Sequence, residues 1–301
     1  MKPKLGFVGI GNMGEPVCRH LLDKGYELLI YDADPEALAK LADTPAASAA
    51  SPEALATEAD VVLLSLPNSA VVEEVVFGKS GLKEGLSSGK ALIDTSSSRP
   101  SSTRGISKRL AADRVDVLDA PVSGGVLRAR EGTLSIMVGG KRAVYEKHRE
   151  ILESFGDKIF YVGDYGAGHL VKALNNLLSA TTLASAAEAA LLARRAGVAP
   201  DAFVEVINTS NGRSYSTEVK FPRYILNRTF DDGFALGLMN KDLKIALETA
   251  AELEFPMPIG STLAQIWELA VARGYGPENH TAIYAFLEDL LGEGDGRYKE
   301  P

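Results

Sequence analysis

The sequence has little cysteine and no pattern of metal ligands. Its single cysteine, Cys18, excludes an internal disulfide, and its four histidines have no metal-binding spacing. Acids and bases are interleaved at a net charge of −8, so no basic surface for nucleic acid is expected. No uncharged apolar stretch reaches ~18 residues, the length of a membrane-spanning helix. We therefore expect a cytoplasmic protein with no metal, nucleic acid or membrane partner.

A glycine pattern follows the first apolar run of the chain. Lys4–Gly14 reads KLGFVGIGNMG, in which Gly9, Gly11 and Gly14 form G-x-G-x-x-G between a strand pattern and a helix pattern. Gly9 is expected to make the tight turn, Gly11 to let a pyrophosphate approach the backbone, and Gly14 to let the helix pack closely. The pyrophosphate would then meet free N–H groups at the start of the helix.

An acid stands where such a cofactor needs one. Asp32 ends the second apolar run, Leu28–Tyr31, eighteen residues after Gly14. Its carboxylate is expected to accept hydrogen bonds from the adenosine ribose and to repel a 2′-phosphate, which favours NAD over NADP. The glycines and Asp32 could instead form an ordinary strand end and turn, but the strand–turn–helix–strand context favours a dinucleotide site.

The chain has two parts with different patterns of apolar residues. Short apolar runs alternate with helical patterns up to Asp164, which is typical of a mostly parallel, doubly wound α/β sheet of the Rossmann type. From Ala167 to Ala196 an Ala- and Leu-rich stretch without proline predicts one helix, and helical periodicity continues beyond it. We predict a dinucleotide-binding domain over residues 1–164 and an all-α domain over 165–301, joined by this long helix.

Seven apolar runs are expected to be the strands. They are Leu5–Val8, Leu28–Tyr31, Val61–Ser65, Ala91–Asp94, Val115–Asp119, Leu134–Val138 and Ile159–Val162. In a doubly wound sheet, ligands bind beyond the carboxyl ends of the strands. The segments that follow three of these runs are rich in small and polar residues, and each taken alone could be an ordinary turn. One of them, Ser123-Gly124-Gly125, could bind a carboxylate through a hydroxyl and two N–H groups.

The long helix carries a lysine and an asparagine on one face. Lys172 and Asn176 are four residues apart in GAGHLVKALNN, so they lie a turn from each other. If Lys172 is buried, its pKa falls and it can act as a general acid or base near neutral pH. It could equally extend to the surface as a solvated lysine. His169, three residues earlier, could line a ligand-binding cleft, but a packed or exposed histidine is the commoner arrangement.

Two further cations are weaker candidates. Lys241 precedes Asp242 at the start of a helical pattern, where an exposed charge pair is the commoner arrangement. Arg213 lies in a loop between helices and could clamp a carboxylate or be solvated.

Four motifs together resemble the β-hydroxyacid dehydrogenases. They are GFVGIGNMG, DAPVSGGVLRAREGTLSIMVGG, GAGHLVKALNN and the GF…NKDL segment at Gly233–Leu243, in the order and spacing of that family. The resemblance covers nearly the whole chain. It implies hydride transfer between a nicotinamide cofactor and a small 3-hydroxy acid, and a homodimer or homotetramer assembled through the helical domain.

The resemblance also implies residue roles. Lys172 matches the catalytic lysine and Asn176 the residue that holds the substrate beside it. Ser123 and Gly124 match the substrate-carboxylate site of the family. Gly125 of the same turn and Arg213 complete the candidate substrate-binding residues. Leu66, Pro67 and Ser97 match cofactor contacts, and Lys241 matches the lysine that approaches the cofactor and the active site. The other expected cofactor-binding residues are those of the glycine pattern and the acid that follows the second apolar run: Gly9, Gly11, Asn12, Met13, Gly14 and Asp32.

The substrate and the rival functions stay open at this point. The Ser210–Ser214 loop looks most like the 3-hydroxyisobutyrate and 2-(hydroxymethyl)glutarate branches, where Arg213 could meet a second carboxylate; reduction of tartronate or succinic semialdehyde is an alternative. GPENHT at Gly276–Thr281 departs from relatives that have Asp before His. An imine reductase and a non-catalytic dinucleotide-binding module are disfavoured because such relatives usually lose the lysine at position 172. A 6-phosphogluconate dehydrogenase has a much longer helical domain.

Overall fold

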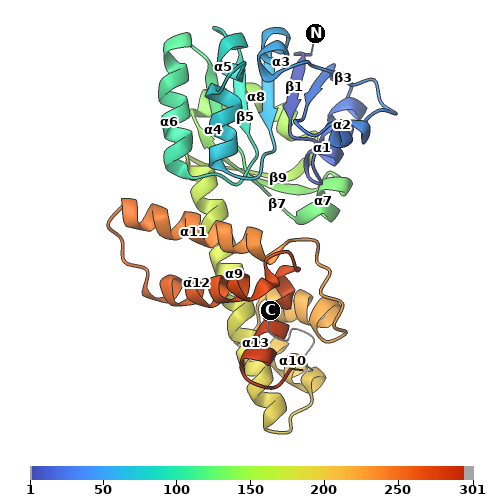
Figure 1. Ribbon diagram of the computed structural model, residues 1–301, viewed down its shortest axis with the longest axis vertical. Helices are drawn as coiled ribbons and strands as arrows, with labels where there is room; N and C mark the ends of the chain where they lie inside the picture. The colour runs from blue at the N-terminus through green and yellow to red at the C-terminus, as the bar shows by residue number, and fades with distance from the viewer. Residues whose placement is uncertain (1, 295–301) are drawn as a thin grey trace. The chain divides into compact units, whose positions relative to one another are not determined.

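The computed structural model describes residues 2–294, which form two compact units (Figure 1). Unit 1 ends at Lys172 and unit 2 begins at Ala173. The division falls inside one continuous helix, α9 (Ala167–Arg195), whereas the sequence pattern predicted the domain boundary after Asp164.

Unit 1 is built on a nine-stranded sheet with the order β3-β2-β1-β4-β5-β6-β8-β7, and β9 pairs with β8. The strands are β1 (Leu5–Val8), β2 (Leu28–Tyr31), β3 (Ala47–Ser48), β4 (Val61–Leu64), β5 (Ala91–Asp94), β6 (Asp116–Asp119), β7 (Val122–Ser123), β8 (Leu134–Gly140) and β9 (Gly156–Gly163). Six neighbouring strands run parallel to one another, in the order β3, β2, β1, β4, β5 and β6. Strand β8 runs antiparallel to β6 and β7. The parallel-dominated, doubly wound sheet is confirmed.

Helices cover both faces of this sheet, as expected when strands are apolar on both sides. One core cluster packs side chains of α1, α2, α7 and α8 against the sheet, and a second packs those of α3, α4 and α6. The helices are α1 (Gly14–Asp23), α2 (Pro35–Ala39), α3 (Pro52–Glu58), α4 (Ser69–Phe77), α5 (Leu82–Gly85), α6 (Pro100–Leu110), η1 (Ala111–Asp113), α7 (Gly125–Glu131) and α8 (Arg142–Leu152).

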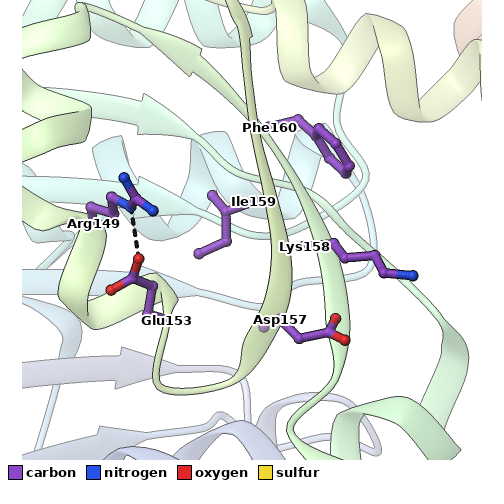
Figure 2. A pocket seen from close by; sticks show the side chains of 7 residues that line it. Arg149, Glu153, Asp157, Lys158, Ile159 and Phe160 are labelled. Atoms are coloured by element: carbon purple, nitrogen blue, oxygen red, sulfur yellow. Dashed lines mark hydrogen bonds and ion pairs between the residues drawn. The ribbon is translucent and has the colours of Figure 1, made fainter.

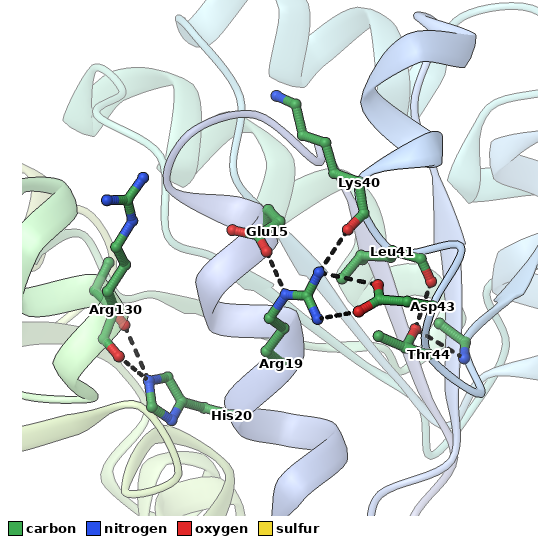
Figure 3. Close-up of polar contacts among 10 residues, drawn as sticks. Glu15, Arg19, His20, Lys40, Leu41, Asp43, Thr44 and Arg130 are labelled. Carbon is green, nitrogen blue, oxygen red and sulfur yellow. Dashed lines mark hydrogen bonds and ion pairs between the residues drawn. The ribbon is translucent and has the colours of Figure 1, made fainter.

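Polar contacts fix α1, the helix that follows the glycine loop (Figure 3). The Arg19 guanidinium pairs with Glu15 one turn earlier and with Asp43, where Nη2 lies 3.0 Å from Oδ1. On another side, His20 Nε2 lies 3.1 Å from the Ala129 carbonyl oxygen at the end of α7. These contacts hold α1 between α7 and the segment after α2.

The hollow beside β9 is not a candidate for catalysis (Figure 2). It has a volume of about 280 Å³ and is lined by α8 and β9. Arg149 Nε already pairs with Glu153 Oε1 at 2.7 Å. Charged side chains such as Lys158 are usual beside an outer strand, because they discourage pairing with another chain.

Unit 2 is helical, in agreement with the predicted all-α part. Its elements after α9 are α10 (Pro200–Asn208), η2 (Ser216–Ile225), α11 (Leu236–Glu252), α12 (Pro258–Ala270), η3 (Val271–Tyr275), η4 (His280–Ala282) and α13 (Ile283–Leu290). The fully buried Trp267 lies in a core formed with residues of α9, α11 and α13. By length and composition α9 could cross a membrane, but its residues Ala180, Leu183 and Ala187 are buried in this core.

The segment η2 is a wide helix with i→i+5 hydrogen bonds. The Leu226 N–H, for example, donates to the Phe221 carbonyl oxygen at 2.9 Å. Pro222 lies inside it and has no N–H to donate, and a wider helix gives its ring room. The helical periodicity beyond the long helix predicted ordinary helices, and this proline explains the difference.

Candidate active site

The glycine loop has the geometry that its spacing predicts. Gly9 has φ +99°, and a Cβ there would lie 2.2 Å from the Ser65 carbonyl oxygen. A Cβ on Gly14 would lie 1.9 Å from the Gly9 carbonyl oxygen, so the start of α1 packs directly on the turn. Gly11 is exposed and faces open space, and no side chain of the described residues caps α1. Asn12 and Met13 complete a loop whose backbone is open to a ligand.

Asp32 is tied to this loop by hydrogen bonds. Its Oδ2 accepts from the Ile10 N–H at 2.6 Å, and its Oδ1 accepts from the Asp34 N–H at 2.9 Å. Each carboxylate oxygen can accept a further hydrogen bond. The nearby Asp34 and Glu36 add negative charge, and no Arg or Lys lies between Tyr31 and Glu36.

The other candidate cofactor loops meet the glycine loop at one sheet edge. Val8, Leu64, Asp94 and Asp119 are paired in one row across the parallel strands β1, β4, β5 and β6. The segments after them therefore leave the sheet together at their carboxyl ends.

The loops after β4 and β5 are held to each other. The Leu66 N–H donates to Ser96 Oγ at 2.9 Å, and the Arg99 N–H donates to Ser69 Oγ at 2.7 Å. The half-buried Leu66 and Ser97 and the exposed Pro67 lie on these loops. The loops are therefore a connected platform beside the glycine loop.

The segment with Ser123 forms a short strand and a glycine turn. Ser123 ends β7 and pairs with Ser135 of β8. Gly124 and Gly125 have φ +133° and +67°, a backbone that L side chains rarely adopt. A Cβ on Gly124 would also lie 2.6 Å from Arg128 Cδ. Both glycines are therefore required by the turn, and the backbone N–H groups and the half-buried Ser123 hydroxyl are grouped at one place.

A buried aspartate holds the first turn of α9. Asp119, the last residue of β6, is fully buried and accepts hydrogen bonds from the Gly166 N–H at 2.8 Å and the His169 N–H at 3.1 Å. A carboxylate at a helix N-terminus satisfies unpaired amides and is favoured by the helix dipole. No sequence motif indicated this role of Asp119.

His169 connects α9 to the loop after β5. Its Nδ1 lies 2.8 Å from the Thr103 hydroxyl and its Nε2 lies 3.0 Å from the Ser96 carbonyl oxygen. The Ser96 carbonyl oxygen can only accept, so Nε2 donates this hydrogen bond. The side chain is fully buried, as the interpretation of a packed histidine requires. Its position three residues before Lys172 ties that helix turn to the platform.

Lys172 and Asn176 are both buried side chains of α9, exposed by 9% and 5%. Asn176 Nδ2 donates to Asp242 Oδ2 at 2.5 Å, and Lys241 Nζ lies 3.2 Å from Asp242 Oδ1. Asp242 is 1% exposed, so within unit 2 it orients both Asn176 and Lys241. Asp242 could have been found from the NKDL motif, where only Lys241 was assigned a role. Arg213 is exposed on the loop before η2.

These features fit a dinucleotide. The open Gly11 backbone and the uncapped start of α1 suit a pyrophosphate, and the Asp32 carboxylate suits a ribose diol. No group of three or more potential metal ligands occurs among residues 2–294. The fold and the glycine loop define a dinucleotide-binding protein of the Rossmann type.

Comparison with known proteins gives the family. Residues 4–163 match the family described as the NAD binding domain of 6-phosphogluconate dehydrogenase. Residues 166–287 match the one described as NAD-binding of NADP-dependent 3-hydroxyisobutyrate dehydrogenase. The chain is 39% identical to 2-(hydroxymethyl)glutarate dehydrogenase of Eubacterium barkeri over 96% of each protein.

Two further relatives agree with this result. Mouse mitochondrial 3-hydroxyisobutyrate dehydrogenase is 33% identical over 96% of this chain and 88% of its own length. The structure of Mycobacterium tuberculosis 3-hydroxyisobutyrate dehydrogenase with L-serine superimposes with a TM-score of 0.89 at 30% identity, covering 95% of this chain and 99% of that one. The chain belongs to the β-hydroxyacid dehydrogenase family and is an NAD(P)-dependent hydroxyacid dehydrogenase.

Proposed function

We propose that the chain interconverts a small 3-hydroxy acid and its semialdehyde, with NAD as cofactor and Lys172 as the general acid and base. The observation that carries this proposal is the burial of Lys172 on α9, one turn before the equally buried Asn176. Relatives that act on 3-hydroxyisobutyrate and 2-(hydroxymethyl)glutarate support the substrate class.

Each residue has a separate task in this proposal. Ser123 and the N–H groups of Gly124 and Gly125 bind the substrate carboxylate. During oxidation, neutral Lys172 takes the proton of the substrate hydroxyl; during reduction, its ammonium returns a proton to the forming alkoxide. Asn176, held by Asp242, orients the substrate beside Lys172. When bound, the nicotinamide accepts or supplies the hydride.

NAD is the proposed cofactor because of the charges near Asp32. A 2′-phosphate would lie against this carboxylate and close to Asp34, with no cation between Tyr31 and Glu36 to receive it. Gly9, Gly14, Leu66, Pro67, Ser97 and Lys241 are proposed to complete the cofactor contacts.

A substrate and cofactor screen tests the function. We expect 3-hydroxyisobutyrate or 2-(hydroxymethyl)glutarate to reduce NAD faster than glycerate or 4-hydroxybutyrate does, with kcat/KM at least tenfold lower with NADP. Asp32→Asn is expected to lower the ratio of kcat/KM with NAD to kcat/KM with NADP, because the neutral amide no longer repels the 2′-phosphate of NADP. NADH binding without turnover of any hydroxy acid would instead support a non-catalytic binding module.

We also propose a homodimer or homotetramer that uses unit 2. Leu178, Phe255 and Ile259 are 65%, 66% and 74% exposed, and large exposed apolar side chains often mark a protein interface. Sedimentation equilibrium is expected to give a mass at least twice the 32.0 kDa of one chain. The mass of one chain at micromolar concentration would rule this assembly out.

A further inference from the structure

Unit 2 contains a buried lysine that the proposed reaction does not use. Lys220 of η2 is 3% exposed, and its Nζ donates to Ser179 Oγ at 2.9 Å. No carboxylate oxygen of the residues described lies within 4.0 Å of this nitrogen. An ammonium has three donors, and lysine is almost never fully buried unless it is paired. The Ser179 hydroxyl occupies one donor, so two N–H groups of Lys220 have no hydrogen-bond acceptor among the residues described.

Among the described residues, no carboxylate forms a direct ion pair with the Lys220 ammonium. Asp232 attracts it, but the carboxylate of Asp232 also contacts His280, with Oδ2 and Nε2 3.4 Å apart, and Tyr224. Burial, reinforced by the charge of Lys220, lowers the pKa of His280 to about 3, so its imidazole is neutral. The Tyr215 ring lies 6.0 Å from Nζ. The cluster therefore presents an ammonium whose one acidic neighbour is shared with other groups.

Lys220 contacts α9 on the face of the helix that also carries Lys172 and Asn176. Ser179 follows Asn176 by three residues, so Lys172, Asn176 and Ser179 share one face of the helix. The rise from Asn176 to Ser179 is about 4.5 Å, a distance that a short methylene chain spans. Lys220 is thus placed beside the next helix turn after Asn176, and it is buried to a similar extent.

We propose that Lys220 binds a second carboxylate of the substrate, and that the preferred substrates are therefore hydroxy dicarboxylic acids. This inference rests on the proposed function, in which Asn176 orients the substrate. Both carboxylate oxygens can accept from the two available N–H groups, and Ser179 holds the ammonium in place. Arg213 is another cation that could meet a second carboxylate, but it is exposed, whereas Lys220 is buried next to the turn that follows Asn176.

Lys220→Met tests the proposal with little change of shape. In the full-length enzyme with NAD, we expect its kcat/KM for 2-(hydroxymethyl)glutarate to fall roughly 10- to 100-fold, the range for a lost hydrogen bond to a charged group, chiefly through KM. The kcat/KM for 3-hydroxyisobutyrate, which has one carboxylate, is expected to stay within about twofold of the wild-type value, because that substrate gives Lys220 no partner. Lys244→Met, which removes an exposed lysine paired with Glu268, should change neither value.

The pH dependence separates charge from shape. Burial lowers the pKa of Lys220 to about 8, and the negative charge of Asp232 opposes this effect. The cation is present below that pH and is lost above it. The wild-type KM for the dicarboxylic substrate is therefore expected to rise above pH 8 relative to the KM for the monocarboxylic one. In Lys220→Met the ratio of the two KM values should not change with pH.

A binding measurement separates this inference from the proposed function. Calorimetry with glutarate, in the presence of NAD, needs no turnover and is expected to give weaker binding to Lys220→Met than to the wild type and Lys244→Met. Failure to oxidise any hydroxy acid, with that loss of glutarate binding, would overturn the proposed function alone. Equal glutarate affinity in the wild type and Lys220→Met, or a loss with Arg213→Met instead, would overturn the role of Lys220.

Discussion

Lys172→Ala is expected to lower kcat by roughly 10²- to 10⁴-fold, the contribution of a positioned general acid or base. The variant removes the one buried amine of α9 proposed to exchange a proton with the substrate hydroxyl. NADH binding is expected to persist, because the glycine loop and Asp32 are held by contacts that do not involve this side chain. Stopped-flow hydride transfer and NADH fluorescence titration measure the two quantities separately.

Two further variants show whether Lys172 acts through its proton or its charge. Lys172→Arg retains a cation but cannot lose a proton near neutral pH, so we expect it to be nearly as slow as Lys172→Ala. A small primary amine added to Lys172→Ala is expected to restore part of the rate. Lys158→Ala, at an exposed lysine of β9, is the matched control and should behave as the wild type. Near-normal turnover by Lys172→Arg would limit Lys172 to an electrostatic role.

The sequence predicts most of unit 1 because its strands are short, continuous apolar runs between helical patterns. Val61–Leu64 and Ala91–Asp94 are buried throughout, as expected for strands of a sheet that is covered on both faces. The two-residue strand β3 and the short strand β7 were not predicted, since neither has an apolar run. The antiparallel direction of β8 depends on a long-range pairing that no local pattern indicates.

The polar contacts of the site were harder to predict, for the same reason. The partners of His169 are Thr103 and Ser96, each more than sixty residues away in the sequence, and only the folded sheet brings them together. Lys220 lies in a segment expected to be an ordinary amphipathic helix, where a lysine is normally solvated. Its burial follows from the packing of η2 on α9, through the contact with Ser179.

Asp119→Ala is expected to destabilise unit 1 by about 2–4 kcal/mol, because it removes a helix cap and leaves two buried amides unpaired. The carboxylate is fully buried and accepts from the N–H groups of Gly166 and His169 at the start of α9. Rearrangement cannot easily compensate, since a Cβ on Gly168 would lie 2.3 Å from the Met137 carbonyl oxygen. At ~2–4 °C per kcal/mol for a domain of this size, the calorimetric Tm should fall by roughly 5–15 °C.

Asp119→Asn refines this prediction by keeping the shape of the side chain. Its amide oxygen can accept from one of the two N–H groups, but its NH₂ group opposes the other and the favourable charge at the helix N-terminus is lost. We expect a Tm between those of the wild type and Asp119→Ala. Asp116→Ala removes a half-buried carboxylate of the same strand, paired with Lys147 at 3.2 Å, and should lower Tm far less. If Asp116→Ala and Asp119→Ala were equally stable, the caps on α9 would contribute no more than a surface ion pair, and the position of Lys172 would depend on the packing of the helix alone.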